Sequence, residues 1–151
     1  MNDESFKSVK ASAGAYVDRS KARKFLVQML YEFASGNSAV AIFDNRSVSA
    51  QDTDYSYLKL CFFAITEEVA EIDDCFKPHL DRDIERLGMV ELSILRLATY
   101  ELKSLLEIPY KVVIDEAVEL AKIFASEDSH KFVNAVLDKV AKDFRQHERV
   151  A

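Results

Sequence analysis

The chain has 151 residues, of which 49% are hydrophobic and 30% charged, proportions typical of a soluble globular domain large enough to bury a core. Its formal net charge of −6 excludes a nucleic-acid binder that is basic over its whole surface. Only 3 Gly and 2 Pro are present. Because β-sandwiches and doubly wound folds need more turn residues than this, the composition predicts an all-helical protein.

Charge is distributed unevenly along the chain. Residues 1–24 carry a net charge of +3, from six Lys or Arg and three Asp or Glu side chains, and the rest of the chain carries −9. A basic start on an acidic body indicates a local surface for an anionic partner, with a solvated tail as the alternative. Residues 1–18 are small and polar and are predicted to be a flexible N-terminal arm, followed by one helical domain at 19–151.

The first helix is predicted from the spacing of its apolar residues. It begins at Arg19 or Ser20 and runs to about Ser35, where the sequence Ser-Gly-Asn ends it. Residues 37–53 are mixed in character, and only a short helical turn at 39–43 is suggested there.

The next helical pattern covers residues 54–72, with Thr53 or Asp54 as its N-cap. A short helix is predicted after it, at 73–80. Because Pro78 disfavours a helix interior, that element is expected to be short or kinked.

Three further helices are predicted in the second half of the chain. Segment 89–105 is apolar on most sides, which predicts a central, buried helix. Pro109 suits the first turn of a helix that reaches about Ala125. The cap cluster at 126–129 precedes a last helix that ends near Arg145.

Motifs for catalysis and metal binding are weak. Glu127 and His130 have the Glu-x-x-His spacing of di-iron carboxylate bundles, but that chemistry needs a second such motif. Neither His79 nor His147 has a Glu three residues earlier, so a metalloenzyme is the weakest hypothesis. The glycines are isolated, so no phosphate-binding loop is predicted, and the sequence has no serine nucleophile motif. We predict no enzymatic activity, no cofactor and no metal.

The cysteines and the apolar runs bear on the compartment. Cys61 and Cys75 form neither a Cys-x-x-Cys pair nor a zinc-binding spacing, and nothing about them indicates an oxidising compartment. Residues 1–18 lack the apolar stretch of a signal peptide, and no run of the sequence is long enough to span a membrane. We therefore predict a cytoplasmic protein without a membrane partner.

The first predicted helix carries the strongest functional pattern. Lys24, Gln28 and Tyr31 share the face opposite its apolar stripe, and Arg19 and Arg23 lie one turn apart along one edge. An exposed aromatic ring among cations suits RNA, because cations pair with phosphates and an unpaired base can stack on the ring. The alternative is a tyrosine at a seam between helices, surrounded by ordinary surface lysines.

Three stretches of the sequence resemble the NusB family of transcription antitermination factors. The first contains RSKAR and QMLY within residues 19–31, and the second contains VELSILRLATYEL and IPYKVVIDEAVELAK within 90–122. The third is EDSHKFVNAVLDK at 127–139. The resemblance runs from about residue 19 to 145 and is weakest over 36–87.

The resemblance implies a fold and a function. The fold would be a compact bundle of about six to seven helices in two packed helical subdomains. The function would be to bind the boxA-type RNA of ribosomal RNA transcripts as a heterodimer with NusE, a small-subunit ribosomal protein. This heterodimer would join an antitermination complex that supports processive transcription by RNA polymerase, with no catalysis and no cofactor.

The resemblance also assigns binding residues by position. The RNA-binding surface would comprise residues of the first and last helices: Arg19, Arg23, Lys24, Tyr31, Asp128, Lys131 and Phe132. Phe132 would then be partly exposed, whereas its periodicity predicts a core position. The NusE side would include Glu91 and, on weaker grounds, Tyr100 and Glu101, with a core position as the alternative for Tyr100.

The sequence departs from the family pattern at two places. Ala135 takes the place of the usual glycine in the last motif, and Ala125-Ser126 stands where family members often have a glycine. The basic cluster is also sparser than in the densest family examples. These departures keep open a helical protein-interaction domain without its own RNA binding. Further alternatives are a homodimer and an RNA-guiding domain like those fused to some ribosomal RNA methyltransferases.

Overall fold

The computed structural model describes residues 12–46, 50 and 52–149, and every regular element in these ranges is a helix. The predicted all-helical class is thus confirmed. The elements, in chain order, are α2 (Ser12–Ala34), α3 (Ala39–Arg46), α4 (Tyr55–Glu67), α5 (Val69–Phe76), η1 (Lys77–His79), η2 (Ile84–Arg86), α6 (Met89–Ser104), α7 (Tyr110–Phe124), α8 (Ser129–Phe144) and α9 (Gln146–Arg149).

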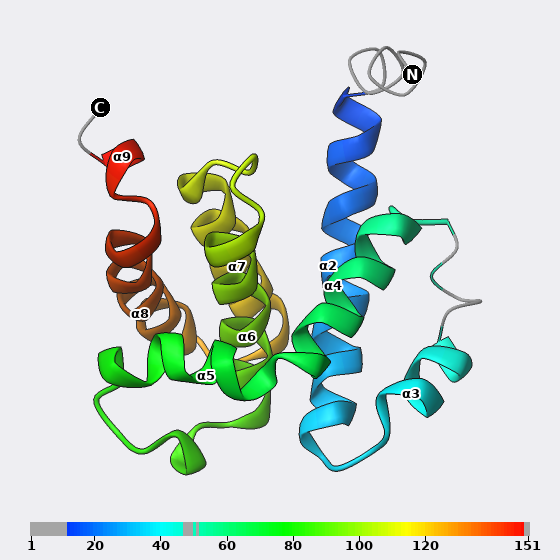
Figure 1. Ribbon diagram of the computed structural model, residues 1–151, viewed down its shortest axis with the longest axis horizontal. Coiled ribbons are helices and arrows are strands. Elements are labelled where there is room, and N and C mark those ends of the chain that lie inside the picture. The colour runs from blue at the N-terminus through cyan, green and yellow to red at the C-terminus, as the bar shows by residue number, and fades with distance from the viewer. Residues whose placement is uncertain (1–11, 47–49, 51, 150–151) are drawn as a thin grey trace.

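The helices form two packed groups, which agrees with the two expected subdomains. Figure 1 shows α2, α3 and α4 on one side of the molecule and α5 to α9 on the other. Extensive packing of α2 against α6 joins the two groups. One continuous cluster of buried apolar side chains runs through both groups, so the two subdomains share a core.

Helix α2 begins earlier than predicted. Residues 12–18, expected in the flexible arm, continue the helix toward the N-terminus, whereas residues 1–11 lie outside the described part of the chain. The segment contains Ala13 and Ala15, and alanine has the highest helix propensity. The segment also contains no proline, which would disrupt a helix. Its polar composition therefore does not prevent it from being helical.

The end of α2 has the hydrogen bonding of a Schellman motif. Gly36 adopts a left-handed φ of 103°, and its N–H donates to the carbonyl of Phe33 at 3.0 Å. The N–H of Asn37 donates to the carbonyl of Glu32 at 3.2 Å. These bonds satisfy carbonyls that the helix end would otherwise leave without partners, which explains why the predicted stop lies here.

Residues 37–76 differ most from the prediction. A full helix, α3, replaces the short turn expected at 39–43, and the hydroxyl of Ser38 accepts from the N–H of Ala41 at 3.1 Å at its start. Asp54 caps α4 as predicted, accepting from the N–H of Tyr57 at 3.3 Å. The single helix expected over 54–72 is in fact two, because the chain breaks at Glu68.

Helix α5 is held on α6 by charged contacts, which explains why the chain turns at the break. The guanidinium of Arg96 binds both carboxylate oxygens of Asp73 at 2.9 Å, and the Lys103 ammonium donates to Glu71 at 3.1 Å. Ile72 and Phe76 point into the core from the same helix. Pro78 falls in the short 3₁₀ turn η1 that follows, in agreement with the expected irregular element.

Helix α6 is the central helix, as its sequence predicted. It packs against α2, α4, α5, α7 and α8, and nine of its side chains are buried. The observed limits of α6 and α7 lie within one residue of those predicted. Helix α8 begins at the last residue of the predicted cap cluster and ends one residue before Arg145. No helix in the described part of the chain is both long enough and apolar enough to cross a membrane.

The carboxyl end of α6 is closed by a side chain from the far end of α8. Arg145 is fully buried and donates to the carbonyls of Glu101 at 3.1 Å, Leu102 at 2.8 Å, Leu105 at 3.0 Å and Ile108 at 2.8 Å. A single guanidinium therefore satisfies the carbonyls at the end of one helix and fixes the position of another.

Candidate nucleic-acid interface

Arg23 lies inside the protein, not on its surface. Its side chain is 2% exposed, its Nε donates to Glu101 Oε2 at 3.0 Å, and its Nη1 lies 3.3 Å from Glu116 Oε1. The hydroxyl of Tyr57 also donates to Glu101. This buried charge network joins α2, α4, α6 and α7, the helices that hold the two subdomains together.

The predicted exposure of Arg23 and Glu101 is therefore corrected. Glu101 is 1% exposed, and burial raises its pKa to about 7, although the positive charges of Arg23 and Arg19 act in the opposite direction. Helical spacing placed Arg23 at the edge of the apolar stripe, from which a long side chain can turn inward or outward. The carboxylates of Glu101 on α6 and Glu116 on α7 turn it inward, because an unpaired buried charge is costly.

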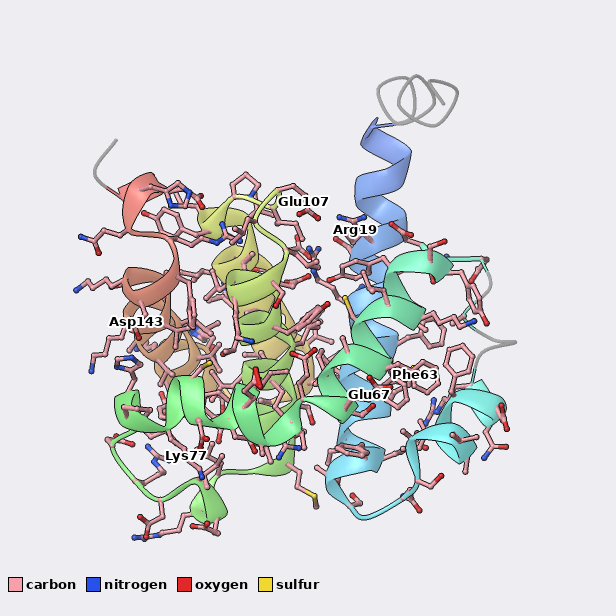
Figure 2. All side chains as sticks on the ribbon, viewed as in Figure 1. Arg19, Phe63, Glu67, Lys77, Glu107 and Asp143 are labelled. Carbon is pink, nitrogen blue, oxygen red and sulfur yellow. The ribbon has the colours of Figure 1, made fainter. Side chains whose placement is uncertain are left out.

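The other members of the first-helix set remain accessible. The Arg19 guanidinium binds Asp54 Oδ2 at 3.1 Å, lies 4.4 Å from the centre of the Tyr57 ring and keeps a side-chain exposure of 35%. Figure 2 shows it along α2, beside the start of α4. Lys24 is exposed, and Tyr31 is 40% exposed. The α2 face thus presents two cations and one aromatic ring to solvent.

The start of α8 supplies the second half of the predicted surface. Asp128 and Lys131 are exposed. Asp128 occupies the N-cap position, but its side chain makes no capping hydrogen bond, so the predicted capping role is not fulfilled. The hydroxyl of Ser129 instead donates to Glu91 Oε2 at 2.7 Å, which ties the start of α8 to the start of α6.

Phe132 is half-buried, whereas the helical periodicity of the sequence predicted a fully buried core position. The guanidinium of Arg82 lies 4.6 Å from the centre of its ring and covers part of it. Arg82 comes from the segment between η1 and η2 and was missed by sequence reasoning, because no local pattern links it to a ring on α8.

Two of the three residues expected to face NusE are not on the surface. Tyr100 is 5% exposed and Glu101 is 1% exposed, because α6 is covered by helices on most of its sides. The core alternative for Tyr100 is thus the correct one. Glu91, at the first turn of α6, is partly exposed.

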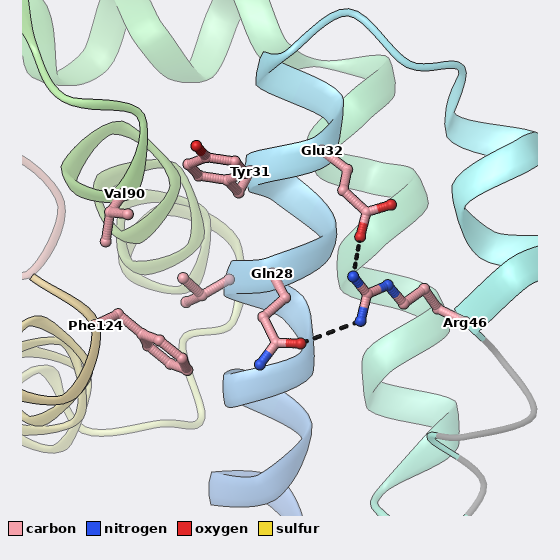
Figure 3. A pocket seen from close by; sticks show the side chains of 7 residues that line it. Gln28, Tyr31, Glu32, Arg46, Val90 and Phe124 are labelled. Atoms are coloured by element: carbon pink, nitrogen blue, oxygen red, sulfur yellow. Dashed lines mark hydrogen bonds and ion pairs between the residues drawn. The ribbon is translucent and has the colours of Figure 1, made fainter.

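Two adjoining hollows connect the two halves of the predicted surface. The first, of about 420 Å³, lies among α2, α3, α6 and α7 and is lined by Gln28 and Arg46, among others (Figure 3). The second, of about 410 Å³, extends to Ser129 at the start of α8. Both are lined by Tyr31, Val90 and Phe124. We refer to the two hollows together as the α2–α7 groove.

The Glu-x-x-His spacing at Glu127 and His130 gains no further ligands from the fold. Among residues 12–46, 50 and 52–149, no three His, Cys, Asp or Glu side chains gather so that they could hold a metal ion. The groove instead offers an aromatic ring, apolar walls and the amino end of a helix. The ring and the apolar walls suit a planar ring, and the carboxylates of Glu32 and Glu91 also line the groove.

A helical fold in which an exposed tyrosine and a helix N-terminus border one groove, with exposed lysines on the same two helices, defines a class of helical binding protein. A family model described as the NusB family matches residues 20–142, so the chain belongs to the NusB family. It is 46% identical to the transcription antitermination protein NusB of Pseudoalteromonas atlantica over 133 residues, which cover 86% of this chain and 95% of the relative. It is 42% identical to NusB of Shewanella frigidimarina over 128 residues, covering 83% and 96% of the two chains.

Solved structures have the same fold. T. maritima NusB matches with a TM-score of 0.74 and 30% identity, covering 88% of this chain and 97% of that one. A crystal structure of the antitermination factors NusB and NusE in complex with dsRNA matches with a TM-score of 0.76 and 30% identity, covering 84% and 98%. The expected bundle of two helical subdomains is therefore that of known NusB structures.

Proposed function

We propose that this chain is a transcription antitermination factor that binds boxA-type RNA of ribosomal RNA transcripts as a heterodimer with NusE. By this binding, and not by catalysis, it would support processive transcription by RNA polymerase within an antitermination complex. The observation that carries the proposal is the α2–α7 groove, which joins Tyr31 to the start of α8. The likeness to a solved NusB–NusE–RNA complex over most of the chain supports it.

The proposed RNA surface follows from exposure and charge. Arg19, Lys24 and Lys131 would contact phosphates, which supply affinity without sequence preference. Tyr31 and Phe132 would stack on unpaired bases. The exposed carboxylate of Asp128 would accept hydrogen bonds from base amino groups or ribose hydroxyls, since it makes no capping hydrogen bond within the protein.

Burial excludes some of the predicted residues from the proposed binding surfaces. Arg23 would act as a positioning residue, because its guanidinium is occupied by carboxylates inside the protein. On the NusE side we keep Glu91 and leave out Tyr100 and Glu101, since a buried side chain cannot reach a partner without local unfolding. The Glu91–Ser129 hydrogen bond would couple the NusE side to the start of α8.

The test is RNA binding by fluorescence anisotropy, with a labelled boxA-type RNA and a scrambled RNA, with and without NusE, at two salt concentrations. We expect selective binding that tightens with NusE and weakens with salt. Tyr31→Ala should lose about 1–3 kcal/mol, the usual contribution of stacking one base on an aromatic ring. Ile123→Ala is the matched control, because Ile123 is 53% exposed on α7 and lines neither hollow.

One observation favours a second candidate function. The burial of Arg23 removes one cation from a basic cluster that was already sparse, which suits a protein-interaction domain without its own RNA binding. Equal affinity for boxA-type and scrambled RNA, even with NusE present, would select this alternative.

A further inference from the structure

We propose that the hollow among α2, α3, α6 and α7 is a pocket for one unpaired nucleobase of the RNA, in which the side-chain amide of Gln28 donates to an acceptor on the edge of that base. The inference rests on the proposed function and goes beyond it, because it assigns a base-reading contact and a base preference. The pocket has a volume of about 420 Å³, within the range of small-molecule sites.

The orientation of the Gln28 amide is fixed by a neighbour. Arg46 Nη1 donates to Gln28 Oε1 at 3.2 Å. A guanidinium has only donors, so the oxygen of the amide must face Arg46 and its NH₂ group must face away from it. Figure 3 shows the amide nitrogen directed toward Phe124, on the side of the pocket opposite Arg46.

Arg46 is itself held in place. It forms an ion pair with Glu32, one turn along α2 from Gln28, so the carboxylate, the guanidinium and the amide form a chain of contacts across α2 and α3. The amide donor is therefore set before any ligand arrives, which lowers the cost of ordering it on binding.

The walls of the pocket suit a planar ring. The side chains of Val27, Val90 and Phe124 are apolar, and the ring of Tyr31 lies at the opening with 40% of the residue exposed. A base held against such walls keeps its polar edge free for a directed hydrogen bond, which is how unpaired bases are usually read in RNA complexes.

The position of the pocket argues for a base of a bound RNA as its occupant. Tyr31, Val90 and Phe124 also line the hollow that continues to Ser129, so RNA lying between Tyr31 and the start of α8 would pass the opening. Lys24 is exposed one turn before Gln28 on α2, where it can contact a phosphate next to the inserted base.

The fixed amide also implies a base preference. Glutamine reads adenine by accepting from one edge position while donating to another, but the Gln28 oxygen is turned toward Arg46, so the amide presents its NH₂ group to the pocket. A donor without an accepting partner beside it favours a base edge that presents a carbonyl, such as that of uracil or guanine, over adenine, whose amino group needs an acceptor.

The experiment is an abasic scan of a boxA-type RNA bound to the complex of this chain with NusE. For the wild type, we expect one position at which removal of the base, or its replacement by adenine, weakens binding about tenfold. Gln28→Leu removes the donor without adding charge, and Gln28→Glu keeps an acceptor for Arg46. Both variants should lose the adenine penalty at that position, lose part of the abasic penalty there and retain the penalties elsewhere, because the apolar walls still hold the base. Binding to NusE shows that the variants are folded.

Ile123→Ala again serves as the control and should retain every penalty. Selective wild-type binding together with Gln28 variants that keep the full abasic profile would overturn the pocket and leave the proposed function intact. Wild-type protein that does not distinguish boxA-type from scrambled RNA would overturn both.

Discussion

The Arg145 side chain lies wholly inside the protein and donates to four carbonyls around the end of α6. The carbonyls of Glu101 and Leu105 also accept from the N–H groups of Leu105 and Ile108, each at 3.0 Å, whereas those of Leu102 and Ile108 depend on the guanidinium. We expect Arg145→Met to lower the free energy of unfolding by at least about 3 kcal/mol, since leaving one buried polar group unsatisfied costs about 1–3 kcal/mol. Urea denaturation measures the change.

Arg86→Met is the matched control for this substitution. Arg86 is exposed on η2, so its loss should change the free energy of unfolding by less than about 0.5 kcal/mol. If the two variants lost similar amounts, the buried guanidinium would not be holding the end of α6.

Glu101 makes the stability of the fold depend on pH. Burial raises its pKa from 4.5 to about 7, so between these values the folded state keeps a proton that the unfolded state has released. The contribution of this group to the free energy of unfolding is therefore largest below pH 4.5 and is lost as the pH rises to about 7. Each pKa unit of difference is worth about 1.4 kcal/mol.

Glu101→Gln removes this titration and keeps the shape of the side chain. We expect the stability of the wild type relative to Glu101→Gln to fall by a few kcal/mol as the pH rises from about 4.5 to about 7, measured by urea denaturation at several pH values. A rise of the relative stability over the same interval would mean that attraction to Arg23 outweighs burial and holds the pKa of Glu101 below its usual value.

At the scale of helices, the best-predicted elements carry their own start and stop signals. The sequence marks α6 and α7 with Gly88 and Pro109 at their starts and with apolar spacing throughout, so their limits needed no knowledge of neighbours. The break at Glu68 could not be predicted in this way. The helix after the break contacts residues far along the chain, as Asp73 contacts Arg96, 23 residues away, and no local pattern reveals such a contact.

The stop signal of α2 gives a prediction at this scale. Gly36 has a φ of 103°, a conformation that costs other residues about 1–2 kcal/mol. Gly36→Ala should therefore lower the free energy of unfolding by about 1 kcal/mol, although an added Cβ would meet no atom within 4 Å.

Gly88→Ala is the comparison, because Gly88 has a φ of −66° and a Cβ there would lie 3.6 Å from a Glu91 oxygen, an ordinary contact. Its effect on thermal unfolding should be smaller. Equal melting temperatures for the two variants would show that the left-handed conformation of Gly36 is not what ends α2.

At the scale of the whole molecule, the candidate site is only partly visible in the sequence. Tyr31 and Lys24 could be placed on one exposed face, because a single helix determines their relation. The inward turn of Arg23 could not be predicted from the sequence, since its carboxylate partner Glu101 lies 78 residues further along the chain. The contact of Arg82 with Phe132 depends in the same way on how the η1–η2 segment packs on α8.

The two subdomains meet at helix α2, which serves the fold on one side and the proposed RNA surface on the other. Its inner side packs on α6 and carries Arg23, and its outer side carries Lys24 and Tyr31. Substitutions one position apart on this helix can therefore have unrelated consequences, one on the joint between the subdomains and the other on ligand binding.

The internal position of Arg23 also changes the meaning of positive charge in this part of the sequence. A cation strengthens binding to a polyanion by releasing the small ions that surround the phosphates, and it can do so only if it reaches them. The Arg23 guanidinium is held by Glu101 and Glu116 inside the protein and does not reach a bound polyanion. The number of basic residues at the start of the chain therefore overstates how many cations can contact a bound polyanion. One of them, Arg23, instead holds helices together inside the protein.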